Sequence, residues 1–315
     1  MHGPRTIVIA GGSGFLGIGL ARHLADTGAR VVILSRRPPA SGPWEHARWD
    51  GRTVGPWAST LDNAAALINL AGRSVDCVKT PDNRDEILRS RVESTLALGA
   101  AVRMLASPPP VWIQMSTAHI YGDPPRVLCD ESSPTGLDLA PDVGRAWEEA
   151  FAKSILPSQH GVVLRTSFVV GPRNPGGAGA LGRLRLLARA GLGGRVGSGQ
   201  QGFSWLHARD FHRIIDRALA DETTRGVYIA SSPSPVSQRD FMRSLRAVAG
   251  GLGALGLALP APAWLVRLGA PLLLRTDPEL ALYGRYVTPR RLLNEGFSFE
   301  YPDLAPALAS IFGPR

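Results

Sequence analysis

Cysteine and lysine are scarce in this chain of 315 residues, with two of each. Cys77 and Cys129 are too few for a disulfide framework or, by themselves, for a metal site. Because Lys79 and Lys153 are the only lysines, nearly all of the positive charge behind the net +9 is arginine. The arginines are spread along the whole chain without a dense basic run, which favours compositional bias over a nucleic-acid-binding surface.

Long uninterrupted apolar runs are also missing. The most apolar late stretch, 252–274, is broken by Pro260, Pro262, Arg267 and Pro271, which argues against a membrane-spanning helix. Because a strand-like run begins almost at once, we expect no signal peptide, and we expect a cytoplasmic protein that binds neither membrane nor nucleic acid. A hydrophobic fraction of 44% is normal for a globular chain with a sizeable core, and the length predicts about two domains.

The most informative stretch is TIVIAGGSGFLG near the start, in which an apolar run leads into regularly spaced glycines. Gly11 would allow a tight turn, Gly14 the close approach of a pyrophosphate, and Gly17 the packing of a helix against the strand. The free N–H groups of the first helical turn, which contains Phe15 and Leu16, would face an anion. The pattern predicts a dinucleotide site, and the alternative is an ordinary glycine turn.

A second predicted strand, over 29–34, ends in Ser35, Arg36 and Arg37. At this position a dinucleotide fold meets the adenosine ribose, where an acidic residue suits NAD and an arginine accommodates the 2′-phosphate of NADP. Because serine replaces the acid and two guanidiniums follow, we expect NADP(H). The alternative is that both arginines only begin a solvated loop. Asp50, further along, would contact the adenine or belong to a surface turn.

Strands and helices continue to alternate along the chain. A predicted strand over 64–69 leads into Leu70, Ala71 and Gly72, of which the last two are small enough to leave room for a cofactor. The next predicted elements are a helix over 81–106, a strand over 111–116, a helix over 143–153 and a strand over 161–167. This alternation predicts an α/β fold with a doubly wound parallel sheet.

The character of the chain changes after the last of these strands, where glycine and arginine become frequent. We expect a cofactor-binding domain over 1–171, and strands at about 202–207 and 226–230 that return to its sheet. A smaller, mostly helical domain for the substrate would comprise 172–201 and 231–315. Within it, Ser237 and Gly250 mark the start and the end of one clear helix.

Several segments occur in the order typical of extended short-chain dehydrogenases/reductases. They are Gly11 to Gly17, Leu70-Ala71-Gly72, Ser116 to Asp123, Trp147-Glu148, Leu164-Arg165-Thr166 and Phe203 to Asp210. The tail YVTPRRLLNEGF, followed by YPDL, is similar to that of the NAD-dependent epimerase/dehydratase-like proteins of the YfcH/SulA-like group, which carry a C-terminal helical domain of unknown function. The resemblance covers essentially the whole chain. It implies a Rossmann domain, bound NADP(H), and a substrate cleft under the C-terminal part.

One feature of that superfamily is missing, namely its Tyr-x-x-x-Lys pair. In the superfamily the tyrosine exchanges a proton, and the lysine one helical turn later lowers its pKa and holds the ribose. Pro141 and Arg145 stand at the corresponding places here. Proline has no proton to give, and arginine cannot act as a base near neutral pH.

The remaining candidates for the reacting site are Ser116, Thr117 and Tyr121. By the resemblance, Ser116 or Thr117 matches the hydroxyl that donates a hydrogen bond to the substrate carbonyl. Tyr121 would either give the proton or pack in the turn after the strand. His119 titrates in the right range, although an isolated histidine is more often structural or exposed.

Arg165, Arg173 and His207 are predicted to line the substrate cleft, with Asp210 beside them; His207 and Asp210 would equally fix a strand to its helix. We expect an NADP(H)-dependent oxidoreductase or epimerase that acts on a small carbonyl or nucleotide-sugar-like substrate, as a monomer or homodimer without a metal. The missing Tyr/Lys pair leaves open an NADP(H)-binding regulatory protein that engages a protein partner through its C-terminal part.

Overall fold

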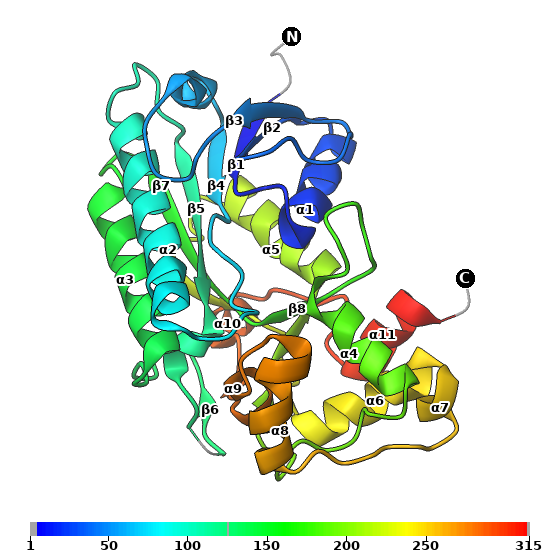
Figure 1. Cartoon of the computed structure of the whole chain (residues 1–315). Coiled ribbons are helices and arrows are strands. Elements are labelled where there is room, and N and C mark those ends of the chain that lie inside the picture. The colour runs from blue at the N-terminus through cyan, green and yellow to red at the C-terminus, as the bar shows by residue number, and fades with distance from the viewer. Residues whose placement is uncertain (1–4, 125, 314–315) are drawn as a thin grey trace.

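A seven-stranded parallel sheet forms the centre of the computed structural model, which describes residues 5–124 and 126–313 (Figure 1). Its strand order is β11-β7-β5-β4-β1-β2-β3. The strands span Thr6–Ala10 (β1), Arg30–Ser35 (β2), Glu45–Arg48 (β3), Ala66–Asn69 (β4), Val111–Thr117 (β5), His160–Thr166 (β7) and Gly226–Ala230 (β11). The chain order reverses between β1 and β4, and open α/β sheets bind their ligands outside the carboxyl ends of the strands at such a switch point.

Helices cover both faces of this sheet, so the predicted doubly wound α/β fold is confirmed. The four helices are α1 (Phe15–Asp26) and α5 (Ala208–Ala220) on one face, and α2 (Pro81–Val102) and α3 (Leu139–Ser154) on the other. Ile7 and Ile9 of β1 pack in the core cluster that contains α1 and α5, whereas Val8 and Ala10 pack in the cluster that contains α2. Because both faces are buried, every position of this strand after Thr6 is apolar.

The later chain adds a smaller, mostly helical part (Figure 1). Its helices are α4 (Gly179–Arg189), α6 (Gln238–Ala249), α7 (Gly251–Ala254), α8 (Ala263–Gly269), α9 (Glu279–Leu282), α10 (Arg290–Asn294) and α11 (Leu304–Phe312), with a π-helical turn η3 (Ala270–Leu274). Leu181, Phe241 and Leu308 join α4, α6 and α11 in one apolar core. Two 3₁₀ turns, η1 (Pro56–Leu61) and η2 (Ala118–Tyr121), belong to the first part of the chain.

Three small two-stranded sheets connect the parts. They pair β8 (Phe168–Val170) with β10 (Trp205–His207), β9 (Gly202–Phe203) with β12 (Val236–Ser237), and β6 (Leu128–Cys129) with β13 (Tyr286–Val287). Only the second pair is antiparallel. None of the helices over the described ranges combines the length and the apolar character that a membrane crossing requires.

The prediction that 202–207 returns to the central sheet was wrong. The rings of Phe168, Phe203 and Phe241 pack together, and this contact holds the segment against β8 and α6. Ser204 separates the two short strands, and its Oγ donates to the carbonyl of Arg285 at 2.9 Å. The other predicted strand, 226–230, does join the central sheet as β11. The division of the chain into two domains stays a prediction.

Two helix boundaries also differ from the sequence prediction. The helix predicted over 143–153 begins earlier, at Leu139, because the Asp138 carboxylate accepts a hydrogen bond from the Leu139 amide and Pro141 lies within the first turn. The helix predicted over 81–106 ends at Val102. The helix beginning after Ser237 is confirmed, since the Ser237 side chain accepts from the Asp240 amide and Gly250 follows the last turn with φ +76°.

Candidate functional site

The turn between β1 and α1 is built closely around its glycines. Gly11 has φ +73°, and a Cβ there would lie 2.6 Å from the Cα of Ala71. A Cβ at Gly17 would lie 2.4 Å from the backbone of Gly12. At Gly14, by contrast, a Cβ would meet no described atom within 4 Å. The turn therefore needs glycine for packing at two positions and leaves open space at the third.

This open position lies at the start of α1. No side chain among the described residues caps the helix, so the first-turn amides, which include those of Phe15 and Leu16, are left for an outside acceptor. The Gly11 amide donates to Leu34 O at 2.8 Å, and the Leu70 amide donates to Ala10 O at 2.8 Å. The ends of β1, β2 and β4 are thereby joined, and the residues predicted from sequence to hold a cofactor meet at one place.

The end of β2 presents two free cations. Ser35 is buried, and its Oγ donates to Arg37 O at 2.7 Å, which orders the loop after the strand. Arg36 and Arg37 are exposed, and their side chains form no ion pair with the part of the chain that the structure describes. Asp50 accepts from the amides of Arg52 and Thr53 at 2.8 and 2.9 Å, so its carboxylate closes a turn; its contact with adenine stays a prediction.

A buried polar frame fixes the end of β4. The Asn69 amide group donates to Thr95 Oγ1 at 3.1 Å and to Gln114 Oε1 at 3.0 Å, while its carbonyl accepts from the Ala71 amide at 3.0 Å. These bonds hold the backbone of Leu70, Ala71 and Gly72 in place under the switch point. Gly72 is exposed, and a Cβ there would lie 3.1 Å from the guanidinium carbon of Arg91 on α2.

The carboxyl ends of β5 and β7 meet α3 in a buried hydrogen-bonded cluster, the Glu148 cluster, which comprises Ser116, Tyr121, Glu148 and Arg165. Ser116 Oγ donates to Glu148 Oε1 at 2.6 Å. Arg165 donates to both oxygens of Glu148, at 2.9 and 2.8 Å, and through Nη1 to the Tyr121 hydroxyl at 2.9 Å. Ser116 and Tyr121 are only 3% and 2% exposed. The structure thus brings together three residues that the sequence placed in the site.

The charges in the Glu148 cluster balance one another. Burial lowers the pKa of Arg165, but the hydrogen bonds and charge of Glu148 outweigh it and raise that pKa above its usual value. Burial raises the pKa of Tyr121 to about 12, against the opposing hydrogen bond from Arg165. The sequence predicts that the Ser116 hydroxyl donates a hydrogen bond to the substrate. In the structure its hydrogen is donated to Glu148, so the hydroxyl can accept a hydrogen bond from a ligand through its lone pairs.

Glu148 is the functional candidate that the sequence analysis missed, since it appeared there only as part of a shared segment. It follows Pro141 and Arg145 at spacings of i+7 and i+3 on α3, so all three lie near one helix face. That spacing is the signal that would have identified it. Arg145 itself turns away, because its Nη1 donates to Gly136 O at 2.6 Å and to Thr135 Oγ1 at 3.1 Å.

Thr117 and His119 lie just beyond Ser116. Thr117 Oγ1 accepts from the His119 amide at 3.1 Å and so caps η2. The prediction that His119 titrates in the neutral range was wrong, because burial and then the charges of Arg285 and Lys79 hold its pKa well below 6.5. The imidazole is neutral at pH 7.

Two of the residues predicted to line the substrate cleft lie outside the Glu148 cluster. His207 is 2% exposed; its Nδ1 accepts from the Arg209 amide at 3.1 Å, and its Nε2 lies 3.3 Å from Ser310 Oγ. This arrangement fixes α5 to its strand and to α11, so the structure favours the structural alternative for His207. Arg173 is exposed after β8, in a loop that reaches the glycine turn, where Asn174 Nδ2 donates to Phe15 O at 2.9 Å.

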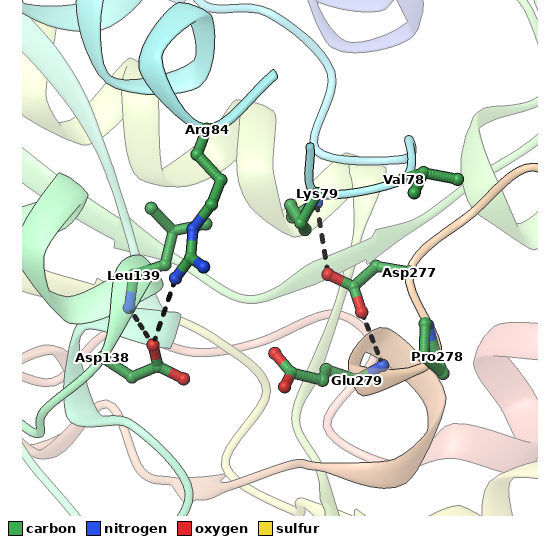
Figure 2. Close-up of a pocket in the computed structure, with 8 residues that line it drawn as sticks. All are labelled: Val78, Lys79, Arg84, Asp138, Leu139, Asp277, Pro278 and Glu279. Carbon is green, nitrogen blue, oxygen red and sulfur yellow. Dashed lines mark hydrogen bonds and ion pairs between the residues drawn. The ribbon is translucent and has the colours of Figure 1, made fainter. Parts of the chain in front are cut away.

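A cavity of about 360 Å³ opens where the loop after β4, the start of α3 and the segment before α9 meet (Figure 2). Its lining residues are Val78, Lys79, Arg84, Asp138, Leu139, Asp277, Pro278 and Glu279. Lys79 Nζ lies 3.9 Å from Asp277, and Arg84 lies 3.6 Å from Asp138. Burial, with Asp277 and Asp138 nearby, raises the pKa of Glu279. None of these residues was predicted from sequence as part of the site.

The family model described as NAD dependent epimerase/dehydratase matches residues 7–230, and a domain of unknown function, DUF1731, matches 261–311. The epimerase family protein SDR39U1 of Bos taurus is 32% identical over 97% of this chain and 99% of its own length. The crystal structure of human SDR39U1 (isoform 2) with NADPH has a TM-score of 0.84 at 29% identity, covering 97% of this chain and 98% of that one. A nucleoside-diphosphate sugar epimerase from Corynebacterium glutamicum has a TM-score of 0.75 at 28% identity, covering 98% of this chain and 58% of that one.

Proposed function

Because the chain belongs to the NAD dependent epimerase/dehydratase family, as the sequence resemblance indicated, we propose that it binds NADP(H) and uses it on a small carbonyl or nucleotide-sugar-like substrate. The reaction would be a reduction, an oxidation or an epimerisation. NADP(H), when bound, supplies the hydride exchange at carbon, and the protein supplies orientation and proton transfer.

The observation that carries the cofactor assignment is the glycine turn with the two free arginines beside it. Side chains are excluded at Gly11 and Gly17, and Gly14 has open space in front of uncapped helix amides. A pyrophosphate fits such a place because amides and the helix dipole both favour an anion. Arg36 and Arg37 would then bind the 2′-phosphate that distinguishes NADP from NAD. The NADPH in the human SDR39U1 structure supports this choice.

Proton transfer would run through Ser116 and Glu148. A substrate hydroxyl that donates to Ser116 Oγ would pass its proton to that oxygen while the Ser116 proton moves to Glu148 Oε1, 2.6 Å away. The reverse transfer would protonate a carbonyl oxygen. Arg165 would hold the carboxylate in place with its two hydrogen bonds, and Tyr121 would hold Arg165. In this way a serine and a glutamate would replace the missing tyrosine and lysine.

Titration calorimetry with NADPH and NADH tests the cofactor assignment. We expect the Arg36→Ala, Arg37→Ala double variant to bind NADPH about tenfold or more weakly and NADH as tightly as the wild type, because charge-assisted bonds to one phosphate are removed. The control is Arg239→Ala with Arg243→Ala, which removes two exposed charges from α6. Equal losses for both cofactors would contradict the assignment to NADP(H). Steady NADPH oxidation over aldehydes, ketones and nucleotide sugars would then identify the substrate class.

A second candidate function is an NADP(H)-binding regulatory protein with little catalysis. It is favoured by Arg145. This residue stands at the position of the superfamily's catalytic lysine, but its side chain donates hydrogen bonds to Thr135 and Gly136. Apolar side chains are also exposed in the C-terminal part, among them Leu255 at 84%, Leu272 at 77% and Trp264 at 64%, and would suit a protein partner. Tight NADPH binding without turnover on any substrate would favour this candidate.

A further inference from the structure

Arg91 on α2 carries a half-buried guanidinium whose charge no described carboxylate balances. It forms no ion pair with the residues that the structure describes, and its one hydrogen bond among them runs from Nη1 to Ile87 O at 2.9 Å. Burial lowers its pKa to about 10, so the group is still charged at pH 7. Arginines removed from water are ordinarily paired, because the charge needs compensation. Arg91 therefore keeps Nε and Nη2 for an acceptor outside the described chain.

The Arg91 guanidinium rests on an indole that is itself fixed. Its carbon lies 5.0 Å from the centroid of the Trp147 ring on α3, a distance at which a cation is attracted to the ring face. Trp147 Nε1 donates to Thr95 Oγ1 at 3.2 Å, and the same oxygen accepts from Asn69 Nδ2 at 3.1 Å. The Thr95 hydroxyl donates in turn to Arg91 O at 2.8 Å. The position of the guanidinium is thus set jointly by β4, α2 and α3.

This guanidinium lies beside the backbone that follows β4. A Cβ at Gly72 would lie 3.1 Å from the guanidinium carbon of Arg91 and 3.3 Å from its Nε. Gly72 is exposed, whereas its neighbour Ala71 is buried against the glycine turn, where a Cβ at Gly11 would lie 2.6 Å from the Ala71 Cα. The cation therefore stands one residue away from the contact between β4 and the proposed pyrophosphate site, at a place that a ligand can reach.

The strand order indicates which part of the cofactor passes this place. β4 lies between β1, whose turn would hold the pyrophosphate, and β5, which ends at Ser116. Neighbouring strands are about 4.8 Å apart, so the ends of β1 and β5 are separated by roughly 10 Å. In NADP(H) the group between the pyrophosphate and the nicotinamide is a ribose. A dinucleotide that extends from β1 to β5 would carry this ribose across the end of β4.

The residue expected to bind that ribose is engaged elsewhere. In the superfamily a lysine of the helix equivalent to α3 holds it, and Arg145 stands at that position here. Its Nη1 donates to Gly136 O at 2.6 Å and to Thr135 Oγ1 at 3.1 Å. A cation from α2 is instead present at the end of β4.

We propose that Arg91 binds the nicotinamide ribose of NADP(H) by donating hydrogen bonds to its hydroxyl groups. The planar guanidinium offers two adjacent donors, which suit the two neighbouring hydroxyls of a ribose. Arg91 would thereby take over the ribose-holding role of the missing lysine, from a different helix. The inference rests on the proposed function and deepens it, because it assigns a cofactor-binding residue that orients the reacting half of the dinucleotide.

The test compares three ligands by titration calorimetry on the full chain. NADPH contains the nicotinamide and its ribose, 2′-phospho-ADP-ribose contains the ribose without the nicotinamide, and 2′-phosphoadenosine 5′-diphosphate contains neither. We expect Arg91→Gln to bind the first two about tenfold or more weakly, the effect of losing hydrogen bonds from a charged donor, and the third within about twofold of wild type. Arg91→Lys should lose less than Arg91→Gln, since an ammonium also donates to hydroxyls.

The matched control is Arg89→Gln, an exposed position on the same helix that pairs with Asp85 and Glu93. It should leave all three affinities unchanged. If Arg91→Gln does not fold, Arg91→Met takes its place, because methionine keeps an apolar chain on the indole and removes the donors. The same pattern of losses is expected for it.

A purely structural role of Arg91 would weaken all three ligands equally or none of them, and either result in a folded variant would overturn the inference while leaving the proposed function intact. A loss confined to NADPH would also overturn it, because the contact would then be with the nicotinamide. If the wild type binds none of the three ligands, the proposed function is wrong and this inference falls with it.

Discussion

Ser116 at the end of β5 and Glu148 on α3 are joined by a hydrogen bond of 2.6 Å, although 32 residues separate them in the chain. Glu148 is further held by Nε and Nη2 on one edge of Arg165, which donate to its two oxygens at 2.9 and 2.8 Å. A carboxylate fixed in this way keeps its orientation and its hydrogen bond to the serine while a substrate binds. In the proposed proton path, Glu148 would take part from the helix on which the tyrosine and lysine are missing.

Replacing Glu148 tests that pair. We expect Glu148→Gln to lower kcat by about 100-fold or more, because a positioned proton-transfer group is lost, while the affinity for NADPH is unchanged. Ser116→Ala should cause a similar loss, and the double variant should be little worse than either single one, since both residues act as one unit. Steady-state kinetics on whichever substrate supports NADPH turnover measures all three.

The matched control for this experiment is Glu149→Gln. Glu149 is the neighbouring residue on α3, but it is exposed, and it pairs with Lys153 at 2.6 Å. We expect it to leave kcat and stability near wild type, because exposed ion pairs contribute little. A Glu148→Gln enzyme that folds and retains full kcat would remove Glu148 from the proton path.

The three glycines of the first turn should respond differently to alanine. Gly17→Ala should destabilise the fold by about 1–3 kcal/mol or more, since its Cβ would lie 2.4 Å from the backbone of Gly12. Gly14→Ala should leave stability nearly unchanged, because no described atom lies within 4 Å of the added carbon. The same carbon would occupy the space of the pyrophosphate, so NADPH affinity should fall at least about tenfold. Urea unfolding and NADPH titration separate the two effects, and a Gly14→Ala protein that binds NADPH normally would argue against a phosphate at this turn.

The sheet and its helices could be predicted from sequence because local pattern specifies them. β1 is apolar at every position after Thr6, and the glycines after it, Gly11 and Gly17, are each required by a backbone contact that the spacing already indicates. The apolar residues of α5, over 208–220, likewise recur at helical spacing, which a local pattern shows. The residues predicted at the ends of β1, β2 and β4 also meet in the structure, where backbone hydrogen bonds join these strand ends.

The remaining features depend on contacts between distant segments, which a local pattern does not carry. The role of Glu148 becomes visible only when Arg165 of β7 and Ser116 of β5 lie beside α3. The pairing of β13 with β6 likewise joins segments that lie far apart in the chain, with Val287 opposite Cys129. His207 was predicted either to line the cleft or to fix a strand to its helix, and its ring centroid lies 4.0 Å from that of Tyr301 in the C-terminal segment.

Asp210 should matter for stability and not for catalysis. It is fully buried, and its two oxygens accept from the amides of Glu300 and Tyr301 at 2.7 and 2.9 Å. Asp210→Asn presents an amide N–H to one of these donors, and we expect a loss of about 1–3 kcal/mol in the free energy of unfolding. The control Asp26→Asn, at an exposed position on α1, should change it by less than about 0.5 kcal/mol. Urea unfolding of both variants checks the difference, and equal stability would contradict the anchoring role.

Stability should also fall in mild acid, and His207 should account for part of that fall. Burial, opposed by Asp210 and aided by Arg209, lowers the pKa of His207 to about 4 from its usual 6.5. The unfolded chain then takes up a proton first, so the contribution of His207 is complete above about pH 6.5 and is lost as the pH falls toward 4. Protonation would also place a hydrogen on Nδ1, which caps α5 by accepting from the Arg209 amide.

His207→Asn separates this effect from the rest of the protein, because asparagine keeps an acceptor at the helix cap and does not titrate. We expect its free energy of unfolding, measured in urea at pH 7, 6 and 5, to decline less steeply than that of the wild type. The slope should not vanish, since burial also lowers the pKa of His212, to about 3, and this acts in the same direction. If wild type and variant lost stability in parallel between pH 7 and 5, His207 would have to be charged or exposed in the folded state, and the contact between α5 and α11 described here would be wrong.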